Sequence, residues 1–161
     1  MASTRLNPAL RRLFRASVSL YHWNCGWLLG HRFLMVVHVG RRTGKRRYTV
    51  LEVMEYRKEG PEMIVMSAFG RNADWFRNIE AGPDPEVAVG SRRFTASWRL
   101  LDKEDAIKVI AGYERRNRFA APIVRAVLSR LLGWRYDGSE GGRSRLAEEL
   151  PLVAFRPKAS R

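Results

Sequence analysis

The connection between two short apolar runs is the feature that most constrains the fold of this chain. Residues 33–39 and 49–56 are rich in valine and other apolar residues, and each run is too short to form a buried helix. The stretch between them, 40–47, holds two glycines and five cations. We therefore predict a β-hairpin with a tight, strongly positive turn. Glycine-containing turns expose backbone N–H groups, which together with Arg and Lys donors suit phosphate or carboxylate groups.

Size, charge and cysteine content narrow the classes of function. A chain of 161 residues can bury one good core, so we expect one folded domain. Its 30 Lys and Arg outnumber 16 Asp and Glu, and the net charge of +14 favours a polyanionic partner: nucleic acid, an acidic membrane or a multiply charged ligand. The single Cys25 excludes an intrachain disulfide, and the three histidines lack zinc-ligand spacing. We expect no metal site and a cytoplasmic location.

The N-terminal segment predicts a basic amphipathic helix over residues 8–21. Apolar side chains recur there at helical spacing, and three arginines lie between them. Two interpretations stay open: a helix that covers one end of the core, or a helix on the inner face of the plasma membrane, which Trp23 and Trp27 would suit. We expect neither a membrane-spanning segment nor a signal sequence. We therefore divide the chain into an amphipathic segment, residues 1–30, and a folded domain, residues 31–161.

The rest of the chain predicts strands separated by helices. Residues 92–101 alternate apolar and polar side chains, as a half-buried strand does. Asp102 and Pro122 are suited to begin helices, and Gly133 to end one. The remaining predictions are strands at 63–67, 86–89 and 150–155, a short helix capped by Asn72 and ended by Gly82, and a mobile loop over 137–144. This order favours an α+β fold, a small barrel of five or six mostly antiparallel strands with flanking helices.

A second candidate site lies where the strand at 63–67 leads into the next helix. Small residues in segment 67–78 let a flat ligand approach the backbone, and N–H groups of the first helical turn can bond its oxygens. Trp75 either stacks on such a ligand or is an ordinary core aromatic. The turn at 40–47 is not the phosphate loop of nucleotide hydrolases, because three residues instead of four separate its glycines and Arg46 follows Lys45.

In this order the two segments resemble the deazaflavin-dependent nitroreductase and quinone reductase family. Its members carry a Gly-Arg-(Lys/Arg)-(Ser/Thr)-Gly turn, present here at 40–44, and later a Trp-(Tyr/Phe)-x-Asn-(Leu/Ile)-x-Ala-x-Pro segment, present at 75–83. The likeness extends over residues 33–101. It implies a split β-barrel, related to flavin-binding reductases, and reduced coenzyme F-420, an 8-hydroxy-5-deazaflavin, as the hydride donor.

The resemblance also implies a set of cofactor-binding residues. Those expected to hold the phosphate and the glutamate-rich tail are Arg41, Arg42, Thr43, Gly44, Lys45 and Arg47. Those expected nearer the ring and ribityl chain are Thr49, Ser67, Ala68, Phe69, Trp75 and Asn78. The chain departs from many relatives at Val50, where they have Pro, and at Ala73-Asp74, where they have His-Pro. The substrate preference of nitroimidazole-reducing members is therefore not carried over.

A deazaflavin carries the hydride chemistry itself, so the protein has to bind, orient and exclude water. Tyr113 is our candidate for orienting a carbonyl or relaying a proton, and a packed helix aromatic is the alternative. We expect a reductase whose acceptor is a quinone, with enones and nitroaromatics open. The alternatives are a non-catalytic deazaflavin-binding protein, a split-barrel reductase that uses flavin mononucleotide (FMN), and a basic nucleic-acid-binding module. The sequence leaves the oligomeric state open, and a homodimer is compatible with it.

Overall fold

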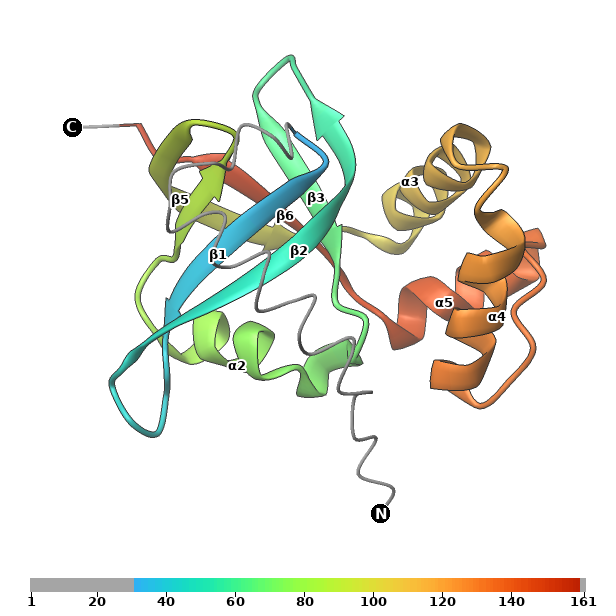
Figure 1. Cartoon of the computed structure of the whole chain (residues 1–161), viewed down its shortest axis with the longest axis horizontal. Coiled ribbons are helices and arrows are strands. Elements are labelled where there is room, and N and C mark those ends of the chain that lie inside the picture. Colours follow the sequence, from blue (N-terminus) through green and yellow to red (C-terminus); the bar gives the residue numbers. More distant parts are fainter. Residues whose placement is uncertain (1–30, 160–161) are drawn as a thin grey trace.

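The computed structural model describes residues 31–159, and in this part of the chain six antiparallel strands close into a barrel (Figure 1). Around the barrel the strands follow the order β1-β2-β3-β6-β5-β4. Their bounds are β1 Phe33–Val39, β2 Arg46–Arg57, β3 Glu62–Met66, β4 Glu86–Val89, β5 Arg92–Leu100 and β6 Leu152–Pro157. The predicted barrel is confirmed. The predicted helix at 8–21 lies outside the described residues.

The hairpin that the sequence predicts is formed by β1 and β2. The two strands pair without interruption from Phe33 opposite Glu52 to Val39 opposite Arg46. Within the turn the Gly44 N–H donates to the Gly40 carbonyl at 2.8 Å, and Gly44 has a φ of 64°, a conformation that favours glycine. The strand pairing fixes both ends of the basic turn and so restricts the conformation of its backbone.

Helix α2, Asp74–Ala81, lies across the end of the barrel from which the β1–β2 turn projects (Figure 1). Its residues Trp75, Phe76 and Ile79 join the barrel interior, which is filled by inward-facing side chains of the strands. The short 3-10 helix η2, Gly70–Asn72, precedes it. The predicted cap at Asn72 is wrong, because that residue belongs to η2 and Ala73, without a side-chain hydrogen bond, precedes α2.

Three further helices form a layer beside the barrel (Figure 1). They are α3 Lys103–Arg116, α4 Ala121–Leu132 and α5 Glu140–Glu149. As predicted, Asp102 caps α3, Pro122 lies in the first turn of α4, and Gly133 ends α4 with a φ of 74°. The predicted loop over 137–144 is wrong in its second half. Ser139 accepts from the Gly142 N–H at 3.0 Å and so caps α5, and the fully buried Leu146 anchors that helix.

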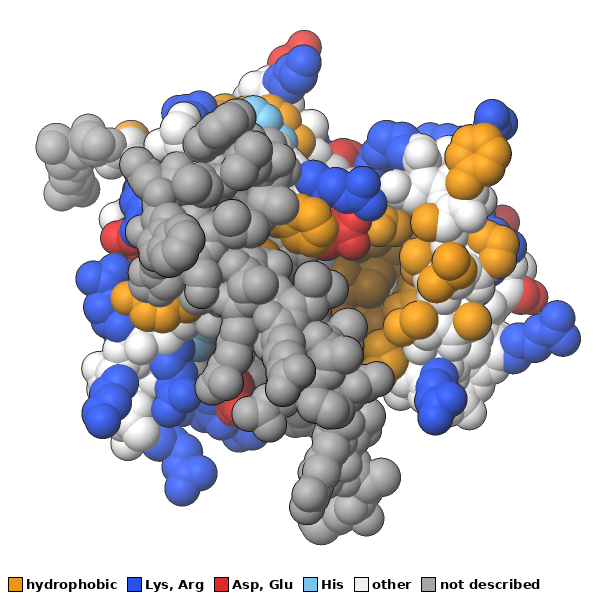
Figure 2. All heavy atoms as spheres, in the orientation of Figure 1, with side chains coloured by type: hydrophobic (Ala, Val, Ile, Leu, Met, Phe, Trp, Pro, Cys, Tyr) orange, Lys and Arg blue, Asp and Glu red, His pale blue; other side chains and the backbone are white. Residues whose placement is uncertain are grey.

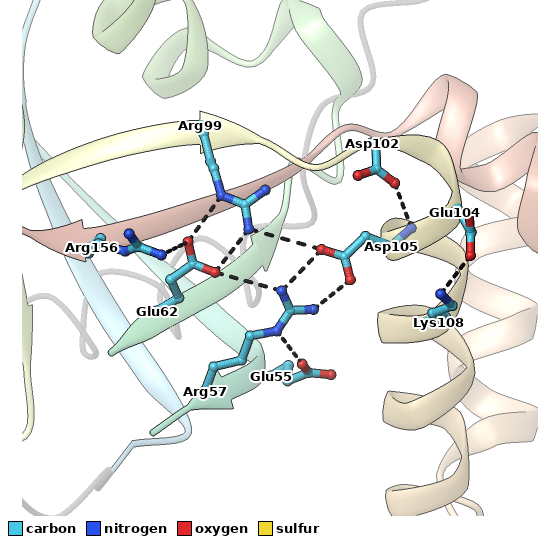
Figure 3. A network of polar contacts seen from close by, with 9 residues as sticks. All are labelled: Glu55, Arg57, Glu62, Arg99, Asp102, Glu104, Asp105, Lys108 and Arg156. Atoms are coloured by element: carbon cyan, nitrogen blue, oxygen red, sulfur yellow. Dashed lines mark hydrogen bonds and ion pairs between the residues drawn. The ribbon is translucent and has the colours of Figure 1, made fainter. Parts of the chain in front are cut away.

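A network of ion pairs attaches α3 to the barrel (Figure 3). Glu62 on β3 is buried. Its carboxylate accepts hydrogen bonds from Arg99 Nε and Nη2, both at 3.0 Å, and from Arg156 Nη2 at 2.9 Å. Arg57 on β2 donates to both carboxylate oxygens of Asp105 on α3, at 2.6 and 3.0 Å. These arginines hold the pKa values of Glu62 and Asp105 below their ordinary range. The network thus places the helical layer at a fixed position on the barrel.

Candidate functional site

Asn78 on α2 joins the two segments that the sequence singles out. Its side chain is buried, and its Oδ1 accepts hydrogen bonds from the Arg41 backbone N–H at 3.1 Å and from Arg41 Nη1 at 2.9 Å. Its Nδ2 lies 3.0 Å from His38 Nδ1. Both Arg41 groups are donors, so the orientation of the amide is settled: Oδ1 faces Arg41 and Nδ2 donates to His38. The basic turn is therefore fastened to α2 through one side chain.

His38 continues the same chain of hydrogen bonds into β2. Because Nδ1 accepts from Asn78, the proton of the neutral ring resides on Nε2, which donates to Thr49 Oγ1 at 3.2 Å. Burial and, to a smaller extent, the positive charge of Arg47 lower the pKa of His38 to about 4, with Asp74 opposing both. His38 is therefore neutral at pH 7. The Thr49 hydroxyl, which accepts from His38, keeps its own hydrogen available for another acceptor.

The cations of the basic turn fall into two groups. Arg41 is engaged by the protein, since its Nη1 also lies 3.0 Å from Asp74 Oδ1. Arg42, Lys45 and Arg47 are exposed, and their side chains make no ion pair within residues 31–159. Three unpaired cations therefore surround a turn whose backbone is held by Asn78 and the strand pairing. This arrangement leaves a concentrated positive charge available to an anionic ligand.

The connection between β3 and α2 exposes two side chains to solvent. Ser67 is fully buried, and its Oγ donates to the Gly70 carbonyl at 2.7 Å, so its hydroxyl closes the connection. Ala68 and Phe69 are exposed. Gly70 has a φ of 62°, and a Cβ there would lie 3.0 Å from the Glu149 carbonyl oxygen. The backbone of this connection is therefore fixed by its own contacts.

Trp75 lies in the barrel core. Its side chain is 6% exposed, and its ring centroid lies 5.8 Å from that of Phe76 and 6.3 Å from that of Phe155. This is the position that the core-aromatic interpretation predicts. As placed, the indole offers little surface to a ligand and supports α2 from beneath.

Tyr113 lies on α3 and is not brought to the network of Asn78, His38 and Thr49. Burial, together with the Glu52 carboxylate to which its hydroxyl hydrogen bonds, raises its pKa to about 12. Glu52 and Thr49 are three residues apart on β2 and so point to opposite faces of the strand. Val50 also points away from Thr49 and packs with Met35 and Ala88. Tyr113 thus contacts the outer face of the barrel wall.

His38 is the residue of this network that sequence reasoning missed. The available signal is a single polar residue in an otherwise apolar strand, at an alternating position with Leu34 and Val36, which face the core. A buried polar group in such a position requires a partner. The sequence does not reveal that the partner is Asn78, forty positions away.

The described part of the chain lacks two other kinds of site. Within residues 31–159, no three His, Cys, Asp or Glu side chains gather closely enough to hold a metal ion. None of the helices in this range has the length and apolar character that crossing a membrane requires.

Comparison with known proteins identifies similar sequences and folds. A family model described as F420H(2)-dependent quinone reductase matches residues 13–119. An F420H(2)-dependent quinone reductase of Mycobacterium tuberculosis (strain H37Rv) is 25% identical over 136 residues, which is 70% of this chain and 88% of the relative. Its counterpart in strain CDC 1551 matches to the same extent. A solved F420-H2-dependent reductase superposes with a TM-score of 0.50 at 17% identity, over 79% of this chain and 96% of the other, and so shares the fold.

Proposed function

Because the chain belongs to the F420H(2)-dependent quinone reductase family, whose model spans residues 13–119, we propose that the basic turn and segment 67–78 form its site for reduced coenzyme F-420. The chain is an F-420-dependent reductase. The assignment of individual residues and of the acceptor is our proposal. It is carried by one observation: the unpaired cations Arg42, Lys45 and Arg47 surround a turn that Asn78 fastens to α2.

The residues of the turn fit the chemistry of the cofactor tail. That tail carries a phosphodiester and several carboxylates, and guanidinium and ammonium groups are the protein's strongest donors to both. Arg42, Lys45 and Arg47 would hold the tail, while the backbone N–H groups of Thr43 and Gly44 donate to the Gly40 carbonyl and so keep the shape of the turn. Arg41 has a different role, because its partners Asp74 and Asn78 already occupy it. We assign Arg41 to holding the turn in place.

The residues nearer the ring have supporting roles of their own. When bound, the reduced deazaflavin supplies a hydride as an electron pair. Ala68 and Phe69, which are exposed, would face the ring and exclude water from it. The Thr49 hydroxyl, held by neutral His38, would donate its hydrogen to a cofactor oxygen. Ser67, Trp75 and Asn78 act through the backbone that they hold, since all three are buried.

We propose a quinone as the acceptor, in line with the name of the family. Of the residues that we propose to face the ring, Thr49, Ala68 and Phe69, only Thr49 carries a transferable proton on its side chain, so solvent or the acceptor's own surroundings would supply protons. Tyr113 remains our candidate for orienting a carbonyl only if the acceptor extends toward the outer face of β2, where its hydroxyl bonds Glu52. Enones and nitroaromatics are the acceptors to test beside quinones.

A binding titration tests the proposed site. Coenzyme F-420 is added to the full chain, and quenching of Trp emission reports binding; the variants are Arg42→Gln and Lys45→Gln. Each variant is expected to bind about 10- to 100-fold more weakly, because one charge-assisted contact is worth about 1.5–3 kcal/mol. The control is Arg92→Gln, an exposed cation of β5 away from the turn, which should bind as the wild type does. Equal affinity of all four proteins would refute the site.

Competitors in the same titration separate the alternative functions. Tighter binding of FMN than of coenzyme F-420 would favour the FMN-dependent reductase, and displacement by duplex DNA at physiological salt would favour a nucleic-acid module. Turnover is followed separately by the return of oxidised-cofactor absorbance with a soluble quinone, an enone and a nitroaromatic. Binding without turnover on any of them would favour cofactor storage.

Several expectations rest on the sequence alone. The division at residue 30 and the membrane contact of residues 1–30 remain proposals, because this segment lies outside the described residues. A cytoplasmic location is also a proposal. A homodimer likewise remains a proposal, which light scattering on the purified chain would test.

A further inference from the structure

Helix α4 carries a stripe of exposed apolar side chains. Phe119, just before the helix, is 86% exposed, Ile123 is 70%, Val127 is 52% and Leu131 is 39%. These residues are spaced by four, so they follow one another along one face of the helix. In Figure 2 the corresponding apolar surface runs over the α4 region, at the right of the molecule. We refer to these four residues as the α4 stripe.

The stripe is not the side of α4 that packs against the rest of the protein. The opposite side of α4 is packed, since Leu128 and Leu132 contact a buried apolar cluster between the helices and the barrel, which includes Ile110, Tyr136 and Leu146. On α3 the exposed positions are charged, among them Glu104 and Lys108, as is usual for a surface helix. Among the exposed positions of α4, Arg130 is the only charged residue. A contiguous apolar face of this kind marks an interaction surface.

The chain segment that carries the stripe is rich in arginine. From 115 to 136 the chain has no Asp, Glu or Lys and six arginines: Arg115, Arg116, Arg118, Arg125, Arg130 and Arg135. Within residues 31–159, only Arg125 among these six has an acidic partner, Glu114 at 3.8 Å. The Arg118 guanidinium lies 4.8 Å from the centre of the Phe119 ring. Arg118 beside Phe119 and the exposed Arg130 on α4 therefore lie at the stripe without an ion-pair partner in the described part of the chain.

We propose that the α4 stripe docks on the surface of an anionic lipid bilayer. An interfacial helix buries an apolar face at the boundary of headgroups and acyl chains while its Arg residues meet lipid phosphates, and α4 has both features. A second copy of this chain fits less well, because a two-fold contact would bring two sets of arginines together. Nucleic acid would meet the arginines and leave the stripe in water.

The α4 stripe shares no residue with the proposed cofactor site or with segment 1–30. Three of its four residues, Ile123, Val127 and Leu131, lie beyond residue 119, where the family match ends. The proposal can therefore be tested without coenzyme F-420, and its outcome does not depend on whether the cofactor site is correct. Its consequence is that the helical layer would set how the barrel sits on a membrane.

Sedimentation with vesicles tests the proposal on the full chain. Vesicles of phosphatidylglycerol and phosphatidylcholine are compared with pure phosphatidylcholine, and the double variant Ile123→Gln/Val127→Gln is compared with Ile123→Leu/Val127→Leu. Both variants change exposed positions and should melt as the wild type does. We expect the Gln variant to bind anionic vesicles at least about tenfold more weakly, and the Leu variant to bind as the wild type does. Arg130→Gln should weaken binding, and Arg92→Gln, away from α4, should weaken it less.

Three results would overturn the proposal. The first is equal binding of the wild type and the Gln variant, which would assign any membrane contact to residues 1–30. The second is absence of wild-type binding to anionic vesicles. The third is a concentration-dependent dimer of the wild type that the Gln variant abolishes while vesicle binding is unaffected, which would identify a second copy of the chain as the partner.

Discussion

The neutral state of buried His38 should make the stability of this protein fall at mildly acidic pH. In the folded state its pKa is lowered to about 4, against 6.5 for the unfolded side chain. Between these values the unfolded chain binds more protons, so stability falls as pH falls through this window and is fully retained above it. At about 1.4 kcal/mol per pH unit, the gap corresponds to about 3 kcal/mol lost between pH 7 and pH 4.

The variant His38→Gln isolates this effect. A glutamine can accept from Asn78 with its carbonyl and donate to Thr49 with its amide, but it does not titrate. Urea unfolding of both proteins at several pH values gives the free energy of unfolding, and the titration of carboxylates such as Glu62 is common to both. The difference between the two proteins should shift by about 3 kcal/mol in favour of the variant from pH 7 to pH 4. Parallel stability curves would refute the assignment of His38 as a buried neutral donor to Thr49.

Three further perturbations test other parts of the structure. Asn78→Leu should lower stability by about 2–4 kcal/mol in urea unfolding, because the Arg41 N–H and His38 Nδ1 lose their partner; an unchanged midpoint would contradict the network. Glu62→Ala should cost about 3–5 kcal/mol at pH 7, because Arg99 loses its buried partner. The difference from wild type should shrink as pH falls below about 4.5, because Glu62 takes up a proton there in the unfolded chain, whereas its pKa in the folded protein is lower; a constant difference would contradict this. Gly44→Ala should cost about 1 kcal/mol through its positive φ, measured by thermal unfolding, whereas Gly141→Ala in α5 should stabilise slightly; the reverse order would contradict the turn geometry.

The barrel and its hairpin were predictable because the signals are local. Apolar alternation, the glycines of the basic turn, and the pair Pro122 and Gly133 each act within a few residues, and the structure has the corresponding elements. Helix α5 was missed because Gly141 and Gly142 disfavour a helix. Its stability comes from Leu146, buried against other elements, which no local pattern reveals.

The candidate site was predictable in outline and not in its internal contacts. The sequence identifies the two segments, but their fastening through Asn78 depends on the register of β1 against β2 and on the position of α2. The two interpretations of Trp75 differ only in three-dimensional packing, and the structure places the ring in the core. The exposed stripe of α4 also escapes sequence analysis, because the same spacing is typical of a buried helix face.

The most direct test of the proposed cofactor site is an NMR titration of the isotope-labelled full chain with coenzyme F-420, followed at backbone amides. The account predicts that the largest shifts occur at residues 40–47 and at Ala68 and Phe69, and that the amides of α4 stay unchanged. Shifts confined to the arginine-rich segment 115–136, with the basic turn unaffected, would contradict it.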